Sequence, residues 1–279
     1  MRIDSQQIKC IVCDLDGTLL LPDATLGERT IAAVKACRER GVQFMLATGR
    51  SVMAAESYRA ALELSGAMIY YNGAELVDMP ESVIISGVFL PLEVALFCVE
   101  LARERKTHFH LFFCDDKDAS IEILMSENPS NAALVYGERT GLNFQYGDLL
   151  HELNMPNPPI CAKGLFIGEG NELEELRAIL HKRFPAMLNI VKSAETFLEI
   201  LHKDASKGNA LKKALVCRGV AEHEVIAFGD EENDISMLHY AGFSAAPANA
   251  KAAVKAAAKM VIGANSEEAV AAFLEENIL

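Results

Sequence analysis

Two aspartates follow an apolar run near the start of the chain. The run ends at Cys13, and the sequence DLDGT that follows it contains Asp14, Asp16 and Gly17. Residues i and i+2 of an extended chain share a face, so we expect Asp14 and Asp16 to point the same way. At about 4 Å and an effective dielectric constant of about 20, their repulsion is roughly 4 kcal/mol, which a cation or a shared proton can offset. The pattern predicts a buried strand that ends in a ligand-binding turn; the alternative is an ordinary acidic turn.

The elements that must position such side chains alternate along the chain. Apolar runs near 8–13, 42–47 and 67–71 are separated by two helical patterns and short connections. This order predicts an α/β fold with a doubly wound, parallel, Rossmann-like sheet. Ligands bind beyond the carboxyl ends of the strands in such sheets. Three polar side chains follow those ends: Asp14, Thr48 and Asn72.

The first of these helical patterns carries boundary signals. Thr25 and Glu28 have capping-box spacing, which predicts that a helix opens at Thr25, and Gly41 is expected to end it. A second helix is expected near 52–64. Later in the chain, the same reading predicts strands at 225–228 and 243–246.

The alternation of strand and helix patterns changes in the middle of the chain. Residues 84–194 are predicted to form an inserted α+β domain, with residues 1–83 and 195–279 forming the core and a strand at 197–201 returning to it. Within the insert, His108 and His110 share a face of a predicted strand. They could contact a substrate or a metal, but a structural role is the more common one for such a pair.

Composition excludes several classes of protein. The chain has 26 Lys and Arg against 39 Asp and Glu, a net charge of −13, so it is a poor candidate for binding nucleic acid or an anionic membrane. The sequence contains no apolar run of about 18 residues, the length that would predict a membrane span. The first residues do not resemble a signal peptide, so a cytoplasmic protein is expected. The seven scattered cysteines predict reduced thiols, with Cys10 and Cys13 packing in the core rather than forming a redox pair. The oligomeric state is not indicated.

The turn DLDGT resembles the first motif of the haloacid dehalogenase-like (HAD) phosphohydrolases. The other three motifs of that family have counterparts in the right order, at Thr48, at Lys207 and in the sequence GDEEND at 229–234. The pattern is most similar to Cof-type members with a class IIB cap inserted after the third strand. The segments ATGR, NGA, SKGNAL and NDISML also fit. One segment departs from the family: Ala246-Pro247-Ala248 replaces the usual Met-Gly before Asn249, so the shape of that loop is open.

The resemblance implies a role for each matched residue. Asp14 would be the nucleophile and Asp16 the general acid and base, with Thr48 and Lys207 completing the catalytic set. Glu231 and Glu232 are interpreted as charges at a helix N-terminus, and Arg50 as either a substrate contact or a solvated side chain. The implied phosphate or substrate contacts are Leu15, Thr48, Gly49, Arg50, Asn72, Lys207 and Asn233. The implied Mg²⁺ ligands are Asp14, Asp230, Asp234 and the backbone carbonyl of Asp16.

The expected activity is Mg²⁺-dependent hydrolysis of small phosphorylated metabolites through an aspartyl-phosphate. Sugar phosphates are the first expectation, and phosphorylated cofactors such as pyridoxal phosphate or a flavin nucleotide are the second. A sugar phosphomutase of the same superfamily and a non-catalytic binder of phosphorylated metabolites remain as alternatives. A pure binder has no use for Asp16, which argues against the last of these. The inserted domain is expected to close over the site, and no substrate can be inferred from its residues.

Overall fold

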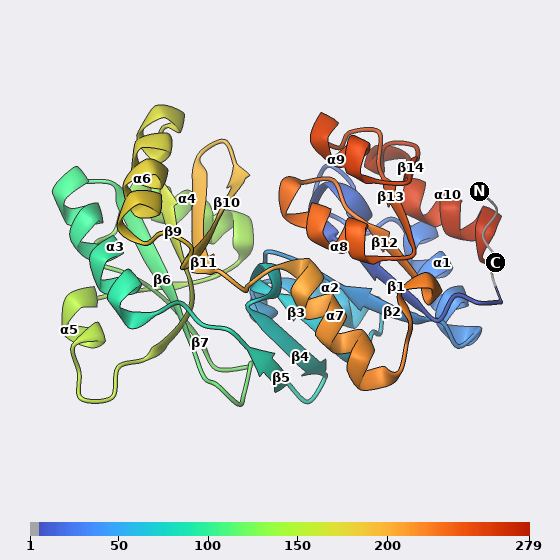
Figure 1. The fold of residues 1–279 in the computed structure, drawn as a ribbon, viewed down its shortest axis with the longest axis horizontal. Coiled ribbons are helices and arrows are strands. Elements are labelled where there is room, and N and C mark those ends of the chain that lie inside the picture. The colour runs from blue at the N-terminus through green and yellow to red at the C-terminus, as the bar shows by residue number, and fades with distance from the viewer. Residues whose placement is uncertain (1–5) are drawn as a thin grey trace.

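A parallel sheet forms the centre of the first of two lobes (Figure 1). The computed structural model describes residues 6–279. All four neighbouring strand pairs of this sheet are parallel, as predicted. Every residue of the central strand and of its neighbour at 10–13 is buried, because helices cover both faces of the sheet. In spatial order the strands are β14 (Met260–Val261), β13 (Phe243–Ala246), β12 (Val225–Phe228), β1 (Cys10–Cys13) and β2 (Gln43–Leu46).

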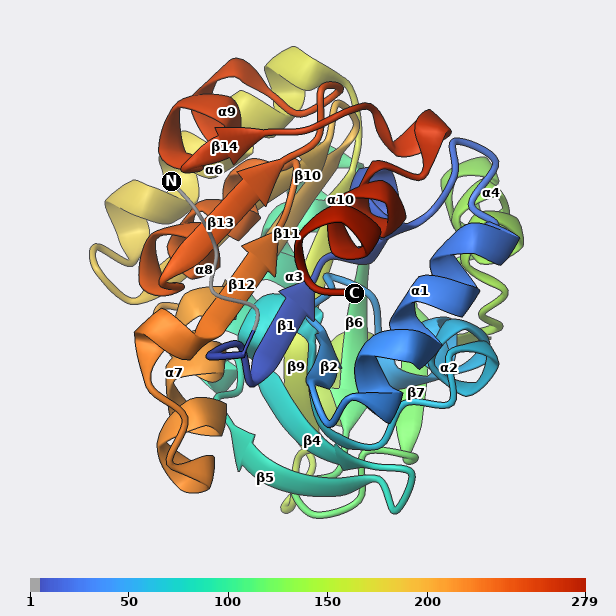
Figure 2. The ribbon, with the colours of Figure 1, turned by 90° about the vertical axis from the view of Figure 1, so that its right-hand side faces the viewer.

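The helices of this lobe lie on both sides of the sheet. Figure 2 shows α1 and α10 on one side and α7 and α8 on the other, which confirms the doubly wound fold. The helices of the lobe are α1 (Glu28–Glu39), α2 (Val52–Ala61), α7 (Lys207–Arg218), α8 (Ile235–Tyr240), α9 (Ala252–Ala257) and α10 (Ala269–Asn277). Within residues 6–279, no helix combines the length and the apolar character needed to cross a membrane.

The start of α1 differs from the prediction. The residue before the helix is Gly27, which has no capping side chain, whereas the amide and hydroxyl of Thr25 both donate to Asp23 in a local turn. The cap comes instead from a distant residue: Glu268 Oε2 accepts from the amide of Thr30 (2.7 Å) and from its hydroxyl (2.9 Å). The expectation that Thr25 opens the helix was therefore wrong, because a carboxylate brought in by tertiary structure satisfies the free amide.

Glu268→Ala is expected to lower the free energy of unfolding by about 0.5–2 kcal/mol, the usual cost of losing a helix N-cap. The carboxylate also favours the positive end of the α1 dipole, which adds to the loss. Urea denaturation of both proteins measures the difference. Glu276→Ala, which removes an exposed glutamate from the C-terminal helix, provides a control, and an unchanged midpoint for Glu268→Ala would contradict this role.

A small antiparallel sheet adjoins the edge of the parallel one. It contains β3 (Gly66–Tyr70), β4 (Glu75–Met79) and β5 (Val83–Gly87), and a parallel bridge between Ala47 and Ile69 joins β3 to the chain after β2. Strand β4 was not predicted. The predicted boundary at 83/84 would cut β5 after its first residue and separate the rest of this strand from its partner β4.

The second lobe is built on a six-stranded sheet. Strand β11 pairs with β9 and β10 in this sheet, so its expected return to the core was wrong. The sheets therefore place the insert between β5 and α7, and we propose these limits in place of 84–194. In spatial order the strands are β10 (Leu188–Ala194), β11 (Phe197–His202), β9 (Ile160–Ile167), β6 (His108–Cys114), β7 (Glu122–Ser126) and β8 (Phe144–Tyr146). The helices are α3 (Leu92–Arg105), α4 (Asn131–Thr140), α5 (Leu149–Leu153) and α6 (Gly170–Arg183).

Candidate active site

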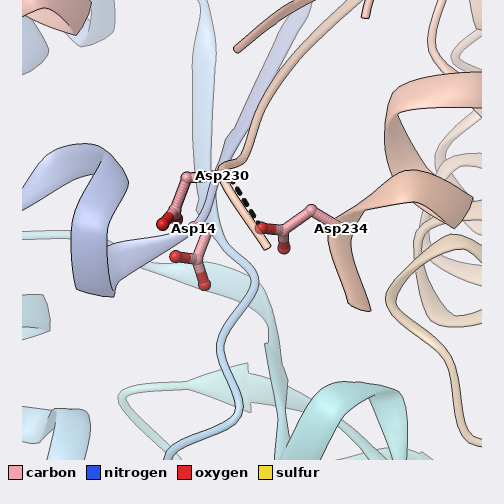
Figure 3. Close-up of side chains that lie close together, drawn as sticks. All are labelled: Asp14, Asp230 and Asp234. Atoms are coloured by element: carbon pink, nitrogen blue, oxygen red, sulfur yellow. Dashed lines mark hydrogen bonds between the residues drawn. The ribbon is translucent and has the colours of Figure 1, made fainter. Parts of the chain in front are cut away.

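Three aspartates meet at the carboxyl end of the parallel sheet (Figure 3). Asp14 follows β1, Asp230 follows the neighbouring β12, and Asp234 lies in the 3-10 turn Glu232–Asp234 just beyond. One carboxylate oxygen from each lies within 4.8 Å of the others. The three residues are 6%, 8% and 0% exposed, respectively. Neighbouring parallel strands end at the same edge, which explains why motifs more than 200 residues apart in the chain meet here.

Lys207 lies between two of these carboxylates. It is the first residue of α7, where the Ser206 hydroxyl caps the helix by accepting from the amide of Asn209. Its Nζ donates to Asp14 Oδ1 and to Asp234 Oδ1, both at 2.5 Å, and the side chain is fully buried. Burial opposes the charge on Lys207, but the two carboxylates outweigh burial and raise the pKa of the ammonium above its ordinary value.

The turn after β1 closes against Asp230. Gly17 has φ = +80°, and a Cβ there would lie 2.3 Å from Asp230 Oδ2, so only glycine fits. The next residue, Thr18, donates its hydroxyl to Asp230 Oδ1 at 2.7 Å. Asp234 is held differently, since its Oδ2 accepts from the amides of Asp230 (2.9 Å) and Glu231 (3.0 Å).

The charge balance of the aspartate group fits a divalent cation. Burial raises the pKa of Asp14 well above its ordinary value, although Lys207 opposes the shift, and burial raises the pKa of Asp230 to about 7. Three buried carboxylates against one lysine leave negative charge that protein groups do not neutralise. Hard carboxylate oxygens are the ligands that Mg²⁺ prefers. The residues present therefore fit the metal that the sequence motifs implied.

Asp16 lies outside this group. Arg50 binds its carboxylate with two parallel hydrogen bonds, Nε to Oδ2 and Nη2 to Oδ1, each 2.7 Å long. The Asp16 side chain is 48% exposed, far more than that of Asp14. The repulsion expected between Asp14 and Asp16 is thus offset by a separate cation for each. Arg50 is thus held by Asp16 instead of being free in solvent, and because it also lines the cavity described below, its predicted contact with the substrate stays a prediction.

A family profile described as haloacid dehalogenase-like hydrolase matches residues 11–274. The chain belongs to this family. A Haemophilus influenzae protein named putative phosphatase is 30% identical over 268 residues, which cover 96% of this chain and 97% of that protein. Pyridoxal phosphate phosphatase YbhA of Escherichia coli is 30% identical over 286 residues, covering 97% and 99%. A haloacid dehalogenase-like hydrolase from Bacteroides thetaiotaomicron has a similar structure, with a TM-score of 0.85, 28% identity and coverage of 96% and 99%.

In this HAD-family phosphatase, hydrogen bonds connect several of the residues that were predicted to contact the substrate. Asn233 Nδ2 donates to Asn72 Oδ1 (2.7 Å), and Asn72 Nδ2 donates to Glu199 Oε2 (2.7 Å). The Thr48 hydroxyl accepts from the amide of Arg50 (3.0 Å) and can still donate its own proton. The Leu15 side chain is fully buried in the core, so only the backbone of that residue remains for a ligand.

Cap residues that were not predicted complete the site. Lys163 of β9 and Glu199 of β11 form a buried ion pair of 3.2 Å. Lys163 Nζ also donates to the Gly49 carbonyl (3.0 Å), and Ser193 donates to Glu199 (2.8 Å). Together with Asp14 and Asp16, these residues line a cavity between the lobes. The signal in the sequence that could have indicated Lys163 and Glu199 was that each is a lone charged residue in an apolar strand.

The cavity has a volume of about 130 Å³. Sites for small molecules usually have about 300–1,000 Å³. A phosphorylated metabolite therefore needs more room than this cavity offers, and closure of the cap over a bound substrate stays a prediction.

His108 and His110 do not reach the cavity. Their rings hydrogen-bond to each other (3.0 Å), and His108 also bonds to the Ser130 hydroxyl (2.9 Å). Burial lowers the pKa of His108 to about 4 and that of His110 well below its ordinary value, so both rings are neutral at pH 7. The His110 ring packs against Tyr136, which does line the cavity. This arrangement agrees with the structural role that the sequence favoured.

The loop whose shape the sequence left open borders the aspartate turn. Asn249 donates to the Gly17 carbonyl (2.8 Å) and accepts from the amide of Asn265 (2.9 Å). Lys251, two residues later, pairs with Glu231 (2.8 Å) and lies 4.0 Å from Glu232. Glu231 is partly buried and lines the cavity, whereas Glu232 is exposed. Both lie outside the aspartate group, consistent with their interpretation as helix-terminal charges.

Proposed function

We propose that this protein is a Mg²⁺-dependent phosphatase that hydrolyses small phosphorylated metabolites through an aspartyl-phosphate. The observation that carries the proposal is the separation of two carboxylates within one cavity. Asp14 is buried against Lys207 and two further aspartates, whereas Asp16 is half-exposed and held by Arg50. A nucleophile and a proton carrier need these different environments.

In the proposed first step, a carboxylate oxygen of Asp14 forms a bond to phosphorus while the bond from phosphorus to the ester oxygen breaks. Asp16 gives that leaving oxygen the proton that it takes from water in the second step of each turnover, and Lys207 stabilises the negative charge near Asp14. In the second step, Asp16 takes a proton from water as the water oxygen attacks phosphorus and releases Asp14. Phosphate and the free alcohol are the products.

Asp14, Asp230 and Asp234 would hold Mg²⁺, together with the backbone carbonyl of Asp16. The ion would supply positive charge that offsets the repulsion between the Asp14 carboxylate and a phosphate dianion. Thr48, Gly49, Asn72 and Asn233 are proposed to contact the phosphoryl group or the rest of the substrate, as the family motifs implied.

The substrate is proposed to be a small metabolite with a phosphomonoester. Sugar phosphates were the first expectation, and the Escherichia coli relative named for pyridoxal phosphate supports phosphorylated cofactors as well. Release of phosphate from a panel of phosphorylated sugars, vitamins and nucleotides would rank these candidates. Turnover of 4-nitrophenyl phosphate tests the activity itself, and its absence with Mg²⁺ present would contradict the proposal.

A phosphomutase is the second candidate, because members with this cap type can return the phosphoryl group to a sugar instead of to water. Dependence of turnover on a sugar bisphosphate activator would favour it. Steady release of inorganic phosphate without an activator would favour the phosphatase.

Arg50→Ala is expected to lower kcat by about 10- to 100-fold, because Asp16 would lose two charge-assisted hydrogen bonds that together orient it. KM should change less, since Arg50 acts through Asp16. Arg50→Lys should recover only part of kcat, because lysine cannot form the paired bonds. Arg29→Ala, which removes a surface ion pair with Glu275, is the control for loss of charge. Equal kcat values for wild type and Arg50→Ala would show that Asp16 does not need this partner.

A further inference from the structure

The cap side of the catalytic cavity carries one arginine whose charge is not balanced. Helix α4 contributes Tyr136 and Arg139, and β11 contributes Phe197. The other cations at the cavity have carboxylate partners: Lys163 pairs with Glu199, and Arg50 pairs with Asp16. Among the described residues, no carboxylate forms an ion pair with Arg139.

Most arginines in residues 6–279 have a carboxylate partner. Acidic residues exceed basic ones by 39 to 26 in the chain, and seven of the eleven described arginines form ion pairs with carboxylates. An arginine that faces the catalytic cavity and stays unpaired in so acidic a protein is therefore available to an anion from outside.

Arg139 is also positioned by an aromatic surface. Its guanidinium carbon lies 5.6 Å from the centre of the Phe197 ring, and that ring packs edge-on against Tyr136 at 5.6 Å. A cation that rests on an aromatic ring keeps its N–H groups free in the plane of the guanidinium. Those N–H groups match the two oxygens of a carboxylate or of a phosphoryl group.

We propose that Arg139 binds a second anionic group on the substrate, so that the preferred substrate is a phosphomonoester whose leaving group carries a carboxylate or a further phosphoryl group. This inference rests on the proposed phosphatase function. Asp14 and Lys207 act at the ester phosphate on the core side of the cavity, and Arg139 holds the far end of the substrate on the cap side. Closure of the cap brings the two ends of the cavity together around the substrate.

A matched series of aryl phosphates tests this role. Phenyl phosphate is the neutral reference. In 3- and 4-carboxyphenyl phosphate the carboxylate lies at two different distances from the ester, and 4-carbamoylphenyl phosphate is the uncharged match. Benzene-1,4-diyl bisphosphate carries a second phosphoryl group. The measured quantity is kcat/KM for each charged ester divided by that for its neutral match. Comparing this ratio between variants cancels the intrinsic reactivity of the esters.

In the wild type, we expect the ratio for at least one charged ester to exceed that in Arg139→Gln by about 10- to 100-fold, the usual value of a hydrogen bond to a charged group. The comparison of the carboxylate with the bisphosphate shows which anion is preferred. Arg139→Lys should keep part of the preference. Arg105→Gln, which removes a cation from α3 that pairs with Glu175, should keep all of it.

Two outcomes would overturn the inference: equal ratios in wild type and Arg139→Gln, or an equal fall of the ratio in Arg105→Gln, which would indicate only a general effect of net charge. Failure of the proposed function is distinguishable, because the wild type would then hydrolyse none of the series, phenyl phosphate included. Hydrolysis of phenyl phosphate with no preference for charged esters would reject the role of Arg139 alone.

Discussion

Asp14→Asn is expected to reduce turnover by about 10⁴-fold or more, because the amide cannot serve as the nucleophile. The substitution preserves the shape of the side chain, and Lys207 keeps its bond to Asp234, so the fold should survive. Circular dichroism and thermal unfolding would check this. No phosphoenzyme should form in this variant.

Asp16→Ala should behave differently at the same site. The variant keeps Asp14 and Lys207 but loses the proton donor and the base that activates water. An ester with a good leaving group hardly needs the donor, so the phosphoaspartate should form at a measurable rate and then decay slowly. Rapid quench with a radiolabelled, activated phosphoryl donor should show label retained on Asp16→Ala and absent from Asp14→Asn.

The mapping of the label decides between roles. Label on a residue other than Asp14, or equal retention by the two variants, would show that the roles are assigned wrongly, even within the same fold. The structure makes the distinction reasonable, because the two carboxylates line one cavity but have different cationic partners, Lys207 and Arg50.

Local sequence was sufficient for most strands. The runs at 225–228 and 243–246 became β12 and β13 with the predicted bounds. Each is short, apolar and bounded by residues that favour turns, which is the signal a buried strand leaves. The partner of a strand leaves no such signal, since pairing depends on residues far away in the chain. This is why β11 was predicted correctly as a strand but assigned to the wrong sheet.

The same distinction applies to the site. Asp14, Lys207 and Asp230 lie together as the sequence predicted, because each belongs to a short motif directly after a strand or at a helix start. The ion pair of Lys163 and Glu199 was missed, although each is a lone charge in an apolar strand, in ICAKGLFI and FLEIL. A buried charge requires a partner, but the sequence does not say which one. The ion pair between Arg50 and Asp16 likewise forms only in the tertiary structure, so the sequence did not indicate it.

Removal of divalent cations is the second change with a large expected effect. Excess EDTA should abolish phosphate release, and Mg²⁺ should restore it, because the buried group of Asp14, Asp230 and Asp234 retains negative charge that Lys207 alone does not neutralise. Ca²⁺ should restore activity poorly, since it is larger and less strictly octahedral than Mg²⁺. Full activity in excess chelator would contradict a metal requirement.

A matched pair of variants locates the metal within the chain. Asp230→Asn should raise the Mg²⁺ concentration for half-maximal activity, and it should reduce the rise in Tm that Mg²⁺ gives to the folded protein, a readout that does not depend on turnover. Glu232→Gln removes the same charge two residues away, from a side chain that is exposed and lies outside the aspartate group. It should leave both quantities close to those of the wild type. If the two variants shifted the Mg²⁺ dependence equally, the ion would be attracted only by the total negative charge at this edge of the sheet. Asp230 would then not be one of its ligands.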